Sequence, residues 1–388
     1  MILLAELQCK DWEHNRVNSG IIKQIRKAFP NEHIKLYAEA RHINNLRNIL
    51  DGDGIELEFA EIEFYDWRQG NQYCKSNYAK LIEQIIRENE NVREIVLLSC
   101  NKGIVLGCDI ESRQYPQVTF HLVLHAAAEE ICHYQRQKKK DKVWRMVSNL
   151  RHFGKSVEPV ISMKDCMEKC CQNNCKFIIF SPNYRSGLKE KLNDEILDKI
   201  TFLHHPFFDS QYEKENVKSN KVKVGIYGQA VNQNALEIIR YYNLHYDNDS
   251  VTFQVMAKAD NEIFMQKNVV RLFDKDYVCN KELEHAISEF DFILIPYDKS
   301  QYIVTASGIL CDAVSQEIPL LMLDSPYFEY YNNYEIGILC KDIASMAKRI
   351  SELFELENAE HFREMDKKLK KVAFEKNVNT LKEVLKVC

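Results

Sequence analysis

Short apolar runs alternate with amphipathic stretches along almost the whole of this 388-residue chain. Such alternation predicts parallel β-sheets with helices on both faces. In the first half, strands are predicted at 2–6, 34–38, 57–62, 95–98, 118–124, 159–161 and 177–180. Helical spacing is clearest at 17–28 and 78–87. This half therefore predicts one doubly wound α/β domain.

The second half repeats the pattern. Strands are predicted at 223–227, 251–256, 269–273, 292–295, 320–323 and 336–339, and helices at 235–242, 281–289, 308–314 and 343–354. Two lysine-rich helical segments follow at about 360–373 and 378–386. Between the halves, the segment 209–220 is polar and shows neither helical nor strand periodicity, so it is the predicted linker. The domains are therefore predicted at 1–208 and 221–373.

The stretch 291–323 carries the most specific pattern in the chain. It contains an apolar strand, a polar loop, a helix that opens at Ser307 and Gly308, and a second apolar strand. Open α/β sheets bind ligands at the carboxyl ends of their strands, and a helix start attracts anions such as phosphate. Asp312 lies about one turn further on, where its carboxylate can accept hydrogen bonds from sugar hydroxyls. Alternatively, Ser307 only caps the helix and Asp312 only complements the helix dipole.

These residues also carry a family resemblance. The order P-Y, a spacer with Tyr302, and then S-G-x-x-x-D-A-x-x-x-x-x-P resembles the donor segment of family-four-like (group 1) GT-B glycosyltransferases. The resemblance implies two Rossmann-like doubly wound domains that face a cleft, with the acceptor bound by the first and the nucleotide sugar by the second. It places Asp312 at the ribose, and it implies that a last helix, about 374–388, packs back on the first domain. Val304 stands where the usual motif has a second glutamate.

Other candidate donor-binding residues follow strands of the second half. Gly228 allows the backbone to turn close to a phosphate, and Gln229 can donate hydrogen bonds. Retaining GT-B enzymes commonly have an arginine and a lysine after this glycine, and neither occurs between 228 and 239. Lys258 could supply the charge, although it could also be merely solvated. Tyr302 could stack on the donor or simply pack.

The acceptor side is predicted in the loop after the first strand and at His125. That loop contains Glu13, His14 and Asn18, which can form hydrogen bonds or move protons, and it lacks the G-x-G-x-x-G of dinucleotide sites. His125 ends the strand at 118–124 and resembles an active-site histidine of several GT-B enzymes. We predict His14 and His125 as catalytic and Glu13 and Asn18 as acceptor-binding. The alternative for each is a cap or a packed structural residue.

Composition narrows the class of protein. The chain is 45% hydrophobic and 28% charged, as in soluble globular proteins, and its net charge of −5 argues against general nucleic-acid binding. No run reaches the ~18 apolar residues of a membrane span, which predicts a cytoplasmic protein. The segment 131–155 is basic and aromatic; it could rest on the inner face of the membrane or be a solvated helix face.

Metal and disulfide chemistry are not expected. Thirteen scattered cysteines favour reduced thiols, and the cluster Cys166, Cys170, Cys171 and Cys175 lacks the usual spacing of zinc sites, although metal binding there stays open. Residues 247–249 match the letters of the D-x-D metal motif, but they lie in a polar turn before a strand, so we do not interpret them as a metal site. We therefore expect no cofactor and a metal-independent reaction with a nucleoside diphosphate sugar as donor substrate.

The predicted function is transfer of a sugar from a nucleoside diphosphate sugar to a glycan or lipid-linked acceptor. Two alternatives stay open: a GT-B-fold sugar-nucleotide epimerase or hydrolase, and a non-catalytic nucleotide-sugar-binding protein. The sugar, the base, the acceptor and the stereochemistry cannot be predicted, because they depend on pocket shape.

Overall fold

The computed structural model describes residues 1–63, 75–133, 161–209, 221–246, 249–274, 278, 280–297, 299–355 and 359–386. The chain divides into two compact units. Unit 1 comprises Met1–Pro206, Ile303–Ala306 and Phe374–Cys388, and unit 2 comprises Phe207–Tyr302 and Ser307–Ala373. Outside the described residues lie 210–220 of the predicted linker, 134–155 of the basic segment, 247–248 of the polar turn at 247–249, and 159–160 of the strand predicted at 159–161.

Unit 1 contains a seven-stranded sheet in the order β3-β2-β1-β4-β5-β6-β7, and every strand pair in it is parallel. Its strands are β1 (Ile2–Ala5), β2 (Ile34–Ala38), β3 (Glu58–Glu61), β4 (Glu94–Leu97), β5 (Thr119–Val123), β6 (Cys175–Ile179) and β7 (Ile200–Phe202). The chain order reverses between β1 and β4. A doubly wound sheet has its binding crevice at that point, beyond the carboxyl ends of the strands.

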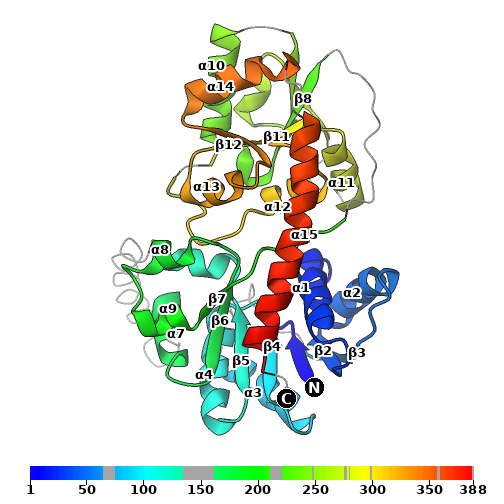
Figure 1. The fold of residues 1–388 in the computed structure, drawn as a ribbon, viewed down its shortest axis with the longest axis vertical. Coiled ribbons are helices and arrows are strands. Elements are labelled where there is room, and N and C mark those ends of the chain that lie inside the picture. The colour runs from blue at the N-terminus through cyan, green and yellow to red at the C-terminus, as the bar shows by residue number, and fades with distance from the viewer. Residues whose placement is uncertain are drawn as a thin grey trace. The chain divides into compact units, whose positions relative to one another are not determined.

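Helices cover both faces of this sheet (Figure 1). They are α1 (Asn15–Ala28), α2 (Ala40–Gly52), α3 (Lys75–Arg87), α4 (Lys102–Gln114), η2 (Ala126–Ala128), α5 (Glu129–Cys132), α7 (Met163–Cys170), α8 (Tyr184–Leu188) and α9 (Asp194–Asp198). Successive side chains of β1 enter two different cores. Leu3 packs with α3, α4 and α7, whereas Leu4 packs with α1, α2 and the end of the chain. Both faces are buried, which is why the strands appear as continuous apolar runs.

Unit 2 contains a six-stranded parallel sheet in the order β10-β9-β8-β11-β12-β13. Its strands are β8 (Val222–Tyr227), β9 (Val251–Met256), β10 (Val269–Arg271), β11 (Phe292–Ile295), β12 (Leu320–Leu323) and β13 (Gly337–Cys340). The order reverses between β8 and β11, so the carboxyl ends of these two strands mark the predicted ligand crevice of unit 2.

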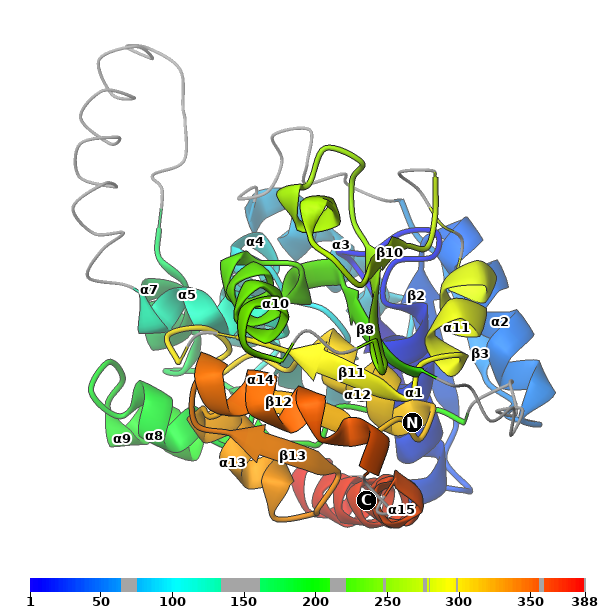
Figure 2. The same ribbon diagram turned by 90° about the horizontal axis from the view of Figure 1, so that it is seen from above.

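One hydrophobic core holds unit 2 together. Its helices are η3 (Gly228–Ala230), α10 (Gln233–His245), η4 (Glu262–Met265), α11 (Asn280–Ser288), α12 (Gly308–Ser315), α13 (Pro326–Asn332), α14 (Ile343–Ser351), η5 (Leu353–Glu355) and α15 (Ala359–Val384). Helices α10 and α14 lie side by side, as the second view also shows (Figure 2).

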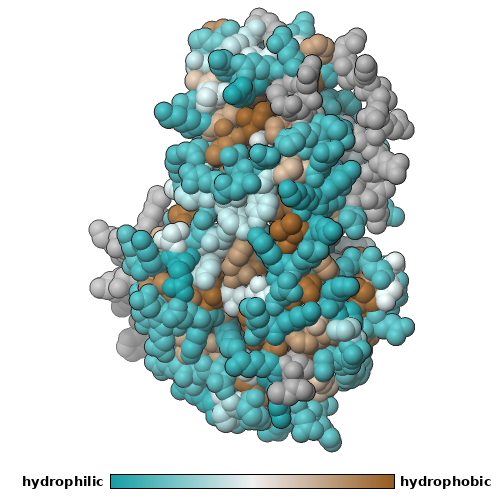
Figure 3. Space-filling model, in the orientation of Figure 1, coloured by the Kyte–Doolittle hydropathy of each residue, from teal (hydrophilic) through white to brown (hydrophobic). Residues whose placement is uncertain are grey.

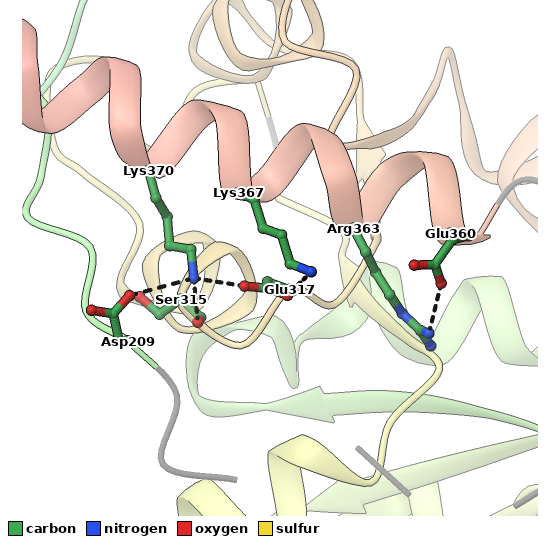
Figure 4. Close-up of polar contacts among 7 residues, drawn as sticks. All are labelled: Asp209, Ser315, Glu317, Glu360, Arg363, Lys367 and Lys370. Atoms are coloured by element: carbon green, nitrogen blue, oxygen red, sulfur yellow. Dashed lines mark hydrogen bonds and ion pairs between the residues drawn. The ribbon is translucent and has the colours of Figure 1, made fainter. Parts of the chain in front are cut away.

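Helix α15 belongs to both units. Its first part is fixed to unit 2 by Lys370, whose Nζ lies 2.9 Å from Glu317 Oε1 and 3.4 Å from the Ser315 carbonyl oxygen (Figure 4). Lys367 also pairs with Glu317, at 3.4 Å. Its last part lies in unit 1, where Asn377 accepts the His204 N–H at 2.8 Å and donates to the His204 carbonyl at 2.7 Å.

The predicted doubly wound α/β architecture is confirmed for both units. The strand predicted at 159–161 is not observed, since Ile161, its one described residue, lies in no strand; the other predicted strands differ from the observed ones by one or two residues at their ends. Two further differences are larger. Strand β7, with only three residues, was not predicted, and the helical segments predicted at 360–373 and 378–386 form the single helix α15.

The four clustered cysteines lie in the core that β1 and α4 share. Cys166, Cys170, Cys171 and Cys175 are all buried free thiols. Burial raises the pKa of Cys166 to about 12, so its thiol stays protonated at neutral pH.

The surface drawn in Figure 3 is mainly hydrophilic, and hydrophobic residues form small separate areas on it. Among the residues that the structure describes, no helix combines the length and the apolar character needed to span a bilayer.

Candidate functional site

In unit 2, two glycines open the backbone at the point where the strand order reverses. Gly228 directly follows β8 with φ 55°, a left-handed conformation that glycine adopts without strain. Gly308 begins α12 after β11. Both are exposed, and a Cβ atom on Gly308 would have no heavy atom within 4 Å. The main chain is therefore accessible at the helix start.

Ser307 fixes the start of α12. Its hydroxyl accepts the Leu310 N–H at 3.3 Å, and its own N–H donates to the Tyr327 hydroxyl at 3.1 Å. The side chain is fully buried. Of the two predicted donor-binding residues here, Ser307 acts as the helix cap, whereas Gly308 stands at the surface.

Asp312 lies one turn into α12 and is partly buried. Tyr227, the last residue of β8, donates its hydroxyl hydrogen to Asp312 Oδ2 at 3.4 Å. Burial raises the pKa of Tyr227 well above its usual range, and the negative charge of Asp312 adds to the rise. The phenol therefore stays neutral and keeps the hydrogen that it donates. The carboxylate is thus oriented toward the carboxyl end of β8.

Two stacked tyrosines precede α12. The rings of Tyr297 and Tyr302 lie 4.2 Å apart and are nearly parallel, at 8°. Tyr302 has φ 55°, an unfavourable conformation for a residue with a Cβ that is typical of functional loops. Two further predicted donor-binding residues, Gln229 and Lys258, are exposed after β8 and β9.

A cavity of about 380 Å³ lies at the same edge of the sheet, beside the ends of β11, β12 and β13. Tyr297 lines it, together with the ion pair of Lys299 and Asp324, whose charged atoms are 2.7 Å apart. None of the predicted donor-binding residues lines this cavity. The cavity therefore lies beside the switch point of unit 2, the point between β8 and β11 where the strand order reverses, and the residues at that point do not form it.

In unit 1, the corresponding point is occupied by a buried carboxylate. Glu6 follows β1 and has no exposed surface. Its Oε1 accepts the N–H groups of Gln8 and Cys9 at 2.8 and 2.9 Å, and its Oε2 accepts the Asn18 amide at 2.8 Å. Burial raises the pKa of Glu6, while these bonds and one from Ser99 oppose the rise by stabilising the ionised form.

Helix α2 holds the loop after β1 through His42. The His42 Nδ1 lies 3.0 Å from the Asp11 carbonyl, which can only accept, so Nδ1 carries the hydrogen. Its Nε2 then accepts from the Asn18 amide at 3.1 Å. The Asn45 side-chain amide also donates to Asp11 Oδ1 at 3.1 Å, and Asp11 has φ 53°. The loop is consequently fixed at several points.

His14 and His125 lie together at the end of this loop. Their ring centroids are 4.5 Å apart. His125 Nε2 donates to the Leu98 carbonyl at 3.0 Å, and burial together with the neighbouring His14 and His205 holds the pKa of His125 well below its usual range. His14 is exposed, with φ 53°, and its Nδ1 lies 3.3 Å from the Ser99 hydroxyl.

The structure thus places two of the predicted acceptor-side residues in contact and gives the other two supporting positions. Glu13 accepts the Lys10 N–H at 3.1 Å and helps to hold the loop. Asn18 is fully buried, and its amide contacts Glu6 and His42. Sequence reasoning missed Glu6, Ser99 and His42. A charged residue at the end of an apolar strand, as at Glu6, was the available signal.

The chain has the GT-B fold, which many glycosyltransferases of solved structure share. Neither a protein-family model nor a curated protein sequence matches it.

Three solved structures illustrate the similarity. A mutant of TarM from S. aureus, in complex with fondaparinux, alpha-GlcNAc-glycerol and UDP, gives a TM-score of 0.61 at 10% identity and covers 100% of both chains. A glycosyltransferase from Rickettsia africae gives a TM-score of 0.57 at 12% identity and covers 100% of this chain and 99% of its own. A protein from Listeria monocytogenes described as a UDP-N-acetylglucosamine 2-epimerase gives a TM-score of 0.57 at 9% identity. The match covers 98% of this chain and 96% of the Listeria chain. At these identities the likeness establishes the fold.

Proposed function

We propose that this protein is a metal-independent glycosyltransferase that moves a sugar from a nucleoside diphosphate sugar to a glycan or lipid-linked acceptor. The observation that carries the proposal is the arrangement at the β8/β11 switch point of unit 2. There an open helix start at Gly308, a left-handed turn at Gly228 and the carboxylate of Asp312 converge. The GT-B fold gives this arrangement its context.

Each part of the arrangement suits a part of the donor. The exposed main chain at Gly308 and the positive end of the helix dipole suit a diphosphate. Asp312 suits the ribose hydroxyls, because an ionised carboxylate accepts strong hydrogen bonds. Lys258, after β9, would add positive charge for the leaving diphosphate.

In unit 1, His14 and His125 would act on the acceptor. Transfer requires a group that removes the proton of the acceptor hydroxyl while its oxygen bonds to the anomeric carbon and the bond to the diphosphate breaks. His14 is exposed and suits this role. A cytoplasmic location, with the basic segment 131–155 against the membrane, would suit a lipid-linked acceptor.

The test is nucleotide binding by the purified protein. We expect one of a panel of nucleoside diphosphates and their sugars to raise the melting temperature, because a ligand of the folded state stabilises it. Asp312→Ala should weaken that binding roughly ten- to a hundredfold, as expected for the loss of one or two hydrogen bonds to a charged group. The control Glu237→Ala, at an exposed residue of α10, should leave it unchanged. Equal affinity in Asp312→Ala and wild type would contradict the donor site.

Two other functions have specific support. The Listeria neighbour favours an epimerase or hydrolase, which would convert the nucleotide sugar in the absence of any acceptor. The lack of arginine and lysine between 228 and 239 favours a binding protein without catalysis, which would bind the nucleotide sugar and leave it intact. Product analysis with and without acceptor distinguishes the three.

A further inference from the structure

The Ser99 hydroxyl joins the buried and the exposed parts of the polar cluster in unit 1. Ser99 lies just after β4 and is 1% exposed. Its Oγ interacts with the Glu6 carboxylate and lies 3.3 Å from His14 Nδ1. Cys9 Sγ approaches the same oxygen at 3.7 Å. A single hydroxyl thus stands between a buried acid and an exposed imidazole.

The direction of the hydrogen bonds follows from what each group can do. Three partners of Glu6 are N–H groups, from Gln8, Cys9 and Asn18, and these can only donate. This surrounding matches an ionised carboxylate, which only accepts. The Ser99 hydroxyl has one hydrogen, and a carboxylate is its strongest available acceptor. Its lone pairs therefore remain for a hydrogen on His14 Nδ1.

We propose that Glu6 and Ser99 are positioning residues that hold His14 in the tautomer with its hydrogen on Nδ1, so that Nε2 is the proton-accepting nitrogen. A histidine side chain in water prefers the opposite tautomer, with the hydrogen on Nε2. The cluster therefore imposes a state that His14 would not adopt by itself.

The backbone and the neighbouring ring support the same orientation. His14 lies in the left-handed region, at φ 53°, in a loop that His42 fixes through Asp11. The His125 ring, 4.5 Å away, limits how His14 can turn. The Nε2 of His125 cannot accept a proton, because it already carries a hydrogen that it donates to the Leu98 carbonyl. Of the two rings, His14 is the one whose Nε2 is left to accept a proton.

The use of Nε2 rests on the proposed function, whereas the tautomer is a property of the free protein. In transfer, Nε2 would take the acceptor proton as the acceptor oxygen bonds to the anomeric carbon. The electron pair of the broken bond would leave with the diphosphate. Such a direct displacement inverts the anomeric configuration.

Nitrogen-15 NMR of histidine-labelled protein tests the tautomer without any substrate. His14→Gln assigns the His14 signals by their loss. We expect wild-type His14 at pH 7.5 to show a pyrrole-like Nδ1 and a pyridine-like Nε2. Ser99→Ala and Glu6→Gln should move the pattern toward the Nε2–H form. Ser112→Ala removes an equally buried hydroxyl, which bonds within α4, and should leave His14 unchanged.

Two results would overturn the inference: a wild-type His14 with its hydrogen on Nε2, or an unchanged pattern in folded Ser99→Ala. The wild-type spectrum decides even if both variants fail to fold. Failure of the proposed function has a different signature, namely an Nδ1–H tautomer in a protein that no nucleoside diphosphate or its sugar stabilises.

Discussion

Replacing His205 with phenylalanine should make unit 1 less sensitive to acid. His205 is 9% exposed and packs edge-on against Phe180, with ring centroids 5.3 Å apart. Burial lowers the pKa of His205 to about 4, whereas histidine in an unfolded chain has a pKa near 6.5. Between these values the unfolded chain binds a proton that the folded chain does not. The stability therefore falls as the pH drops below about 6.5.

The size of the loss follows from the two pKa values. At pH 5 the unfolded ring is almost fully protonated, while the folded ring carries roughly a tenth of a proton. The pH then lies about 1.5 units below the unfolded pKa. Each unit corresponds to about 1.4 kcal/mol, so His205 should contribute about 2 kcal/mol of destabilisation relative to neutral pH.

Urea unfolding of unit 1 at pH 7 and pH 5, followed by circular dichroism, measures this loss. With an m-value of about 2 kcal/mol/M, the midpoint of His205→Phe should fall by about 1 M less than that of wild type on acidification. The control Leu203→Ala removes a fully buried neighbour that does not titrate. It should lower the stability by roughly 2–4 kcal/mol at both pH values. An equal acid-induced fall in wild type and His205→Phe would refute the reasoning.

Two more substitutions test packing within each unit. Glu129→Gln should lower the stability of unit 1 by about 1–3 kcal/mol and speed proteolysis near 303–304, because the carboxylate accepts both backbone N–H groups there, at 3.0 and 2.9 Å. Unchanged proteolysis would contradict that role. Gly337→Ala should lower the urea midpoint of unit 2 by roughly 1 M or more, because its Cβ would lie 2.2 Å from the Leu320 carbonyl oxygen. Gly308→Ala lies in the same unit and has no heavy atom within 4 Å of the new Cβ, so it is the matched control, and equal midpoints in the two variants would contradict the clash.

Most of the fold was predictable because the central strands of both sheets, β1, β4, β11 and β12, are buried on both faces. Runs such as Phe292–Ile295 contain no polar residue, and they mark a parallel sheet clearly. Helix α15 was less clear because its apolar side chains change partners: Leu369 packs in unit 2, whereas Val378 and Leu381 pack in unit 1. The pattern looks interrupted at this change although the helix continues.

The candidate sites were predictable where neighbours in sequence make the site. Gly308 and Asp312 lie on one helix, so spacing alone places them on one face. The polar cluster of unit 1 could not be found in this way. Glu6 and Ser99 are brought together by the pairing of β1 with β4, and no local period records that contact.

Helix α15 also sets the order in which a nascent chain can complete its folding. Val378, Leu381 and Leu385 close a core whose other described members almost all precede Pro206. The ribosome must therefore make all of unit 2 before that core can be covered. During this interval apolar side chains of α1 and of the unit 1 sheet stay exposed, which is the kind of surface that chaperones bind. A chain stopped before residue 374 should consequently need chaperone help that the longer chain can dispense with.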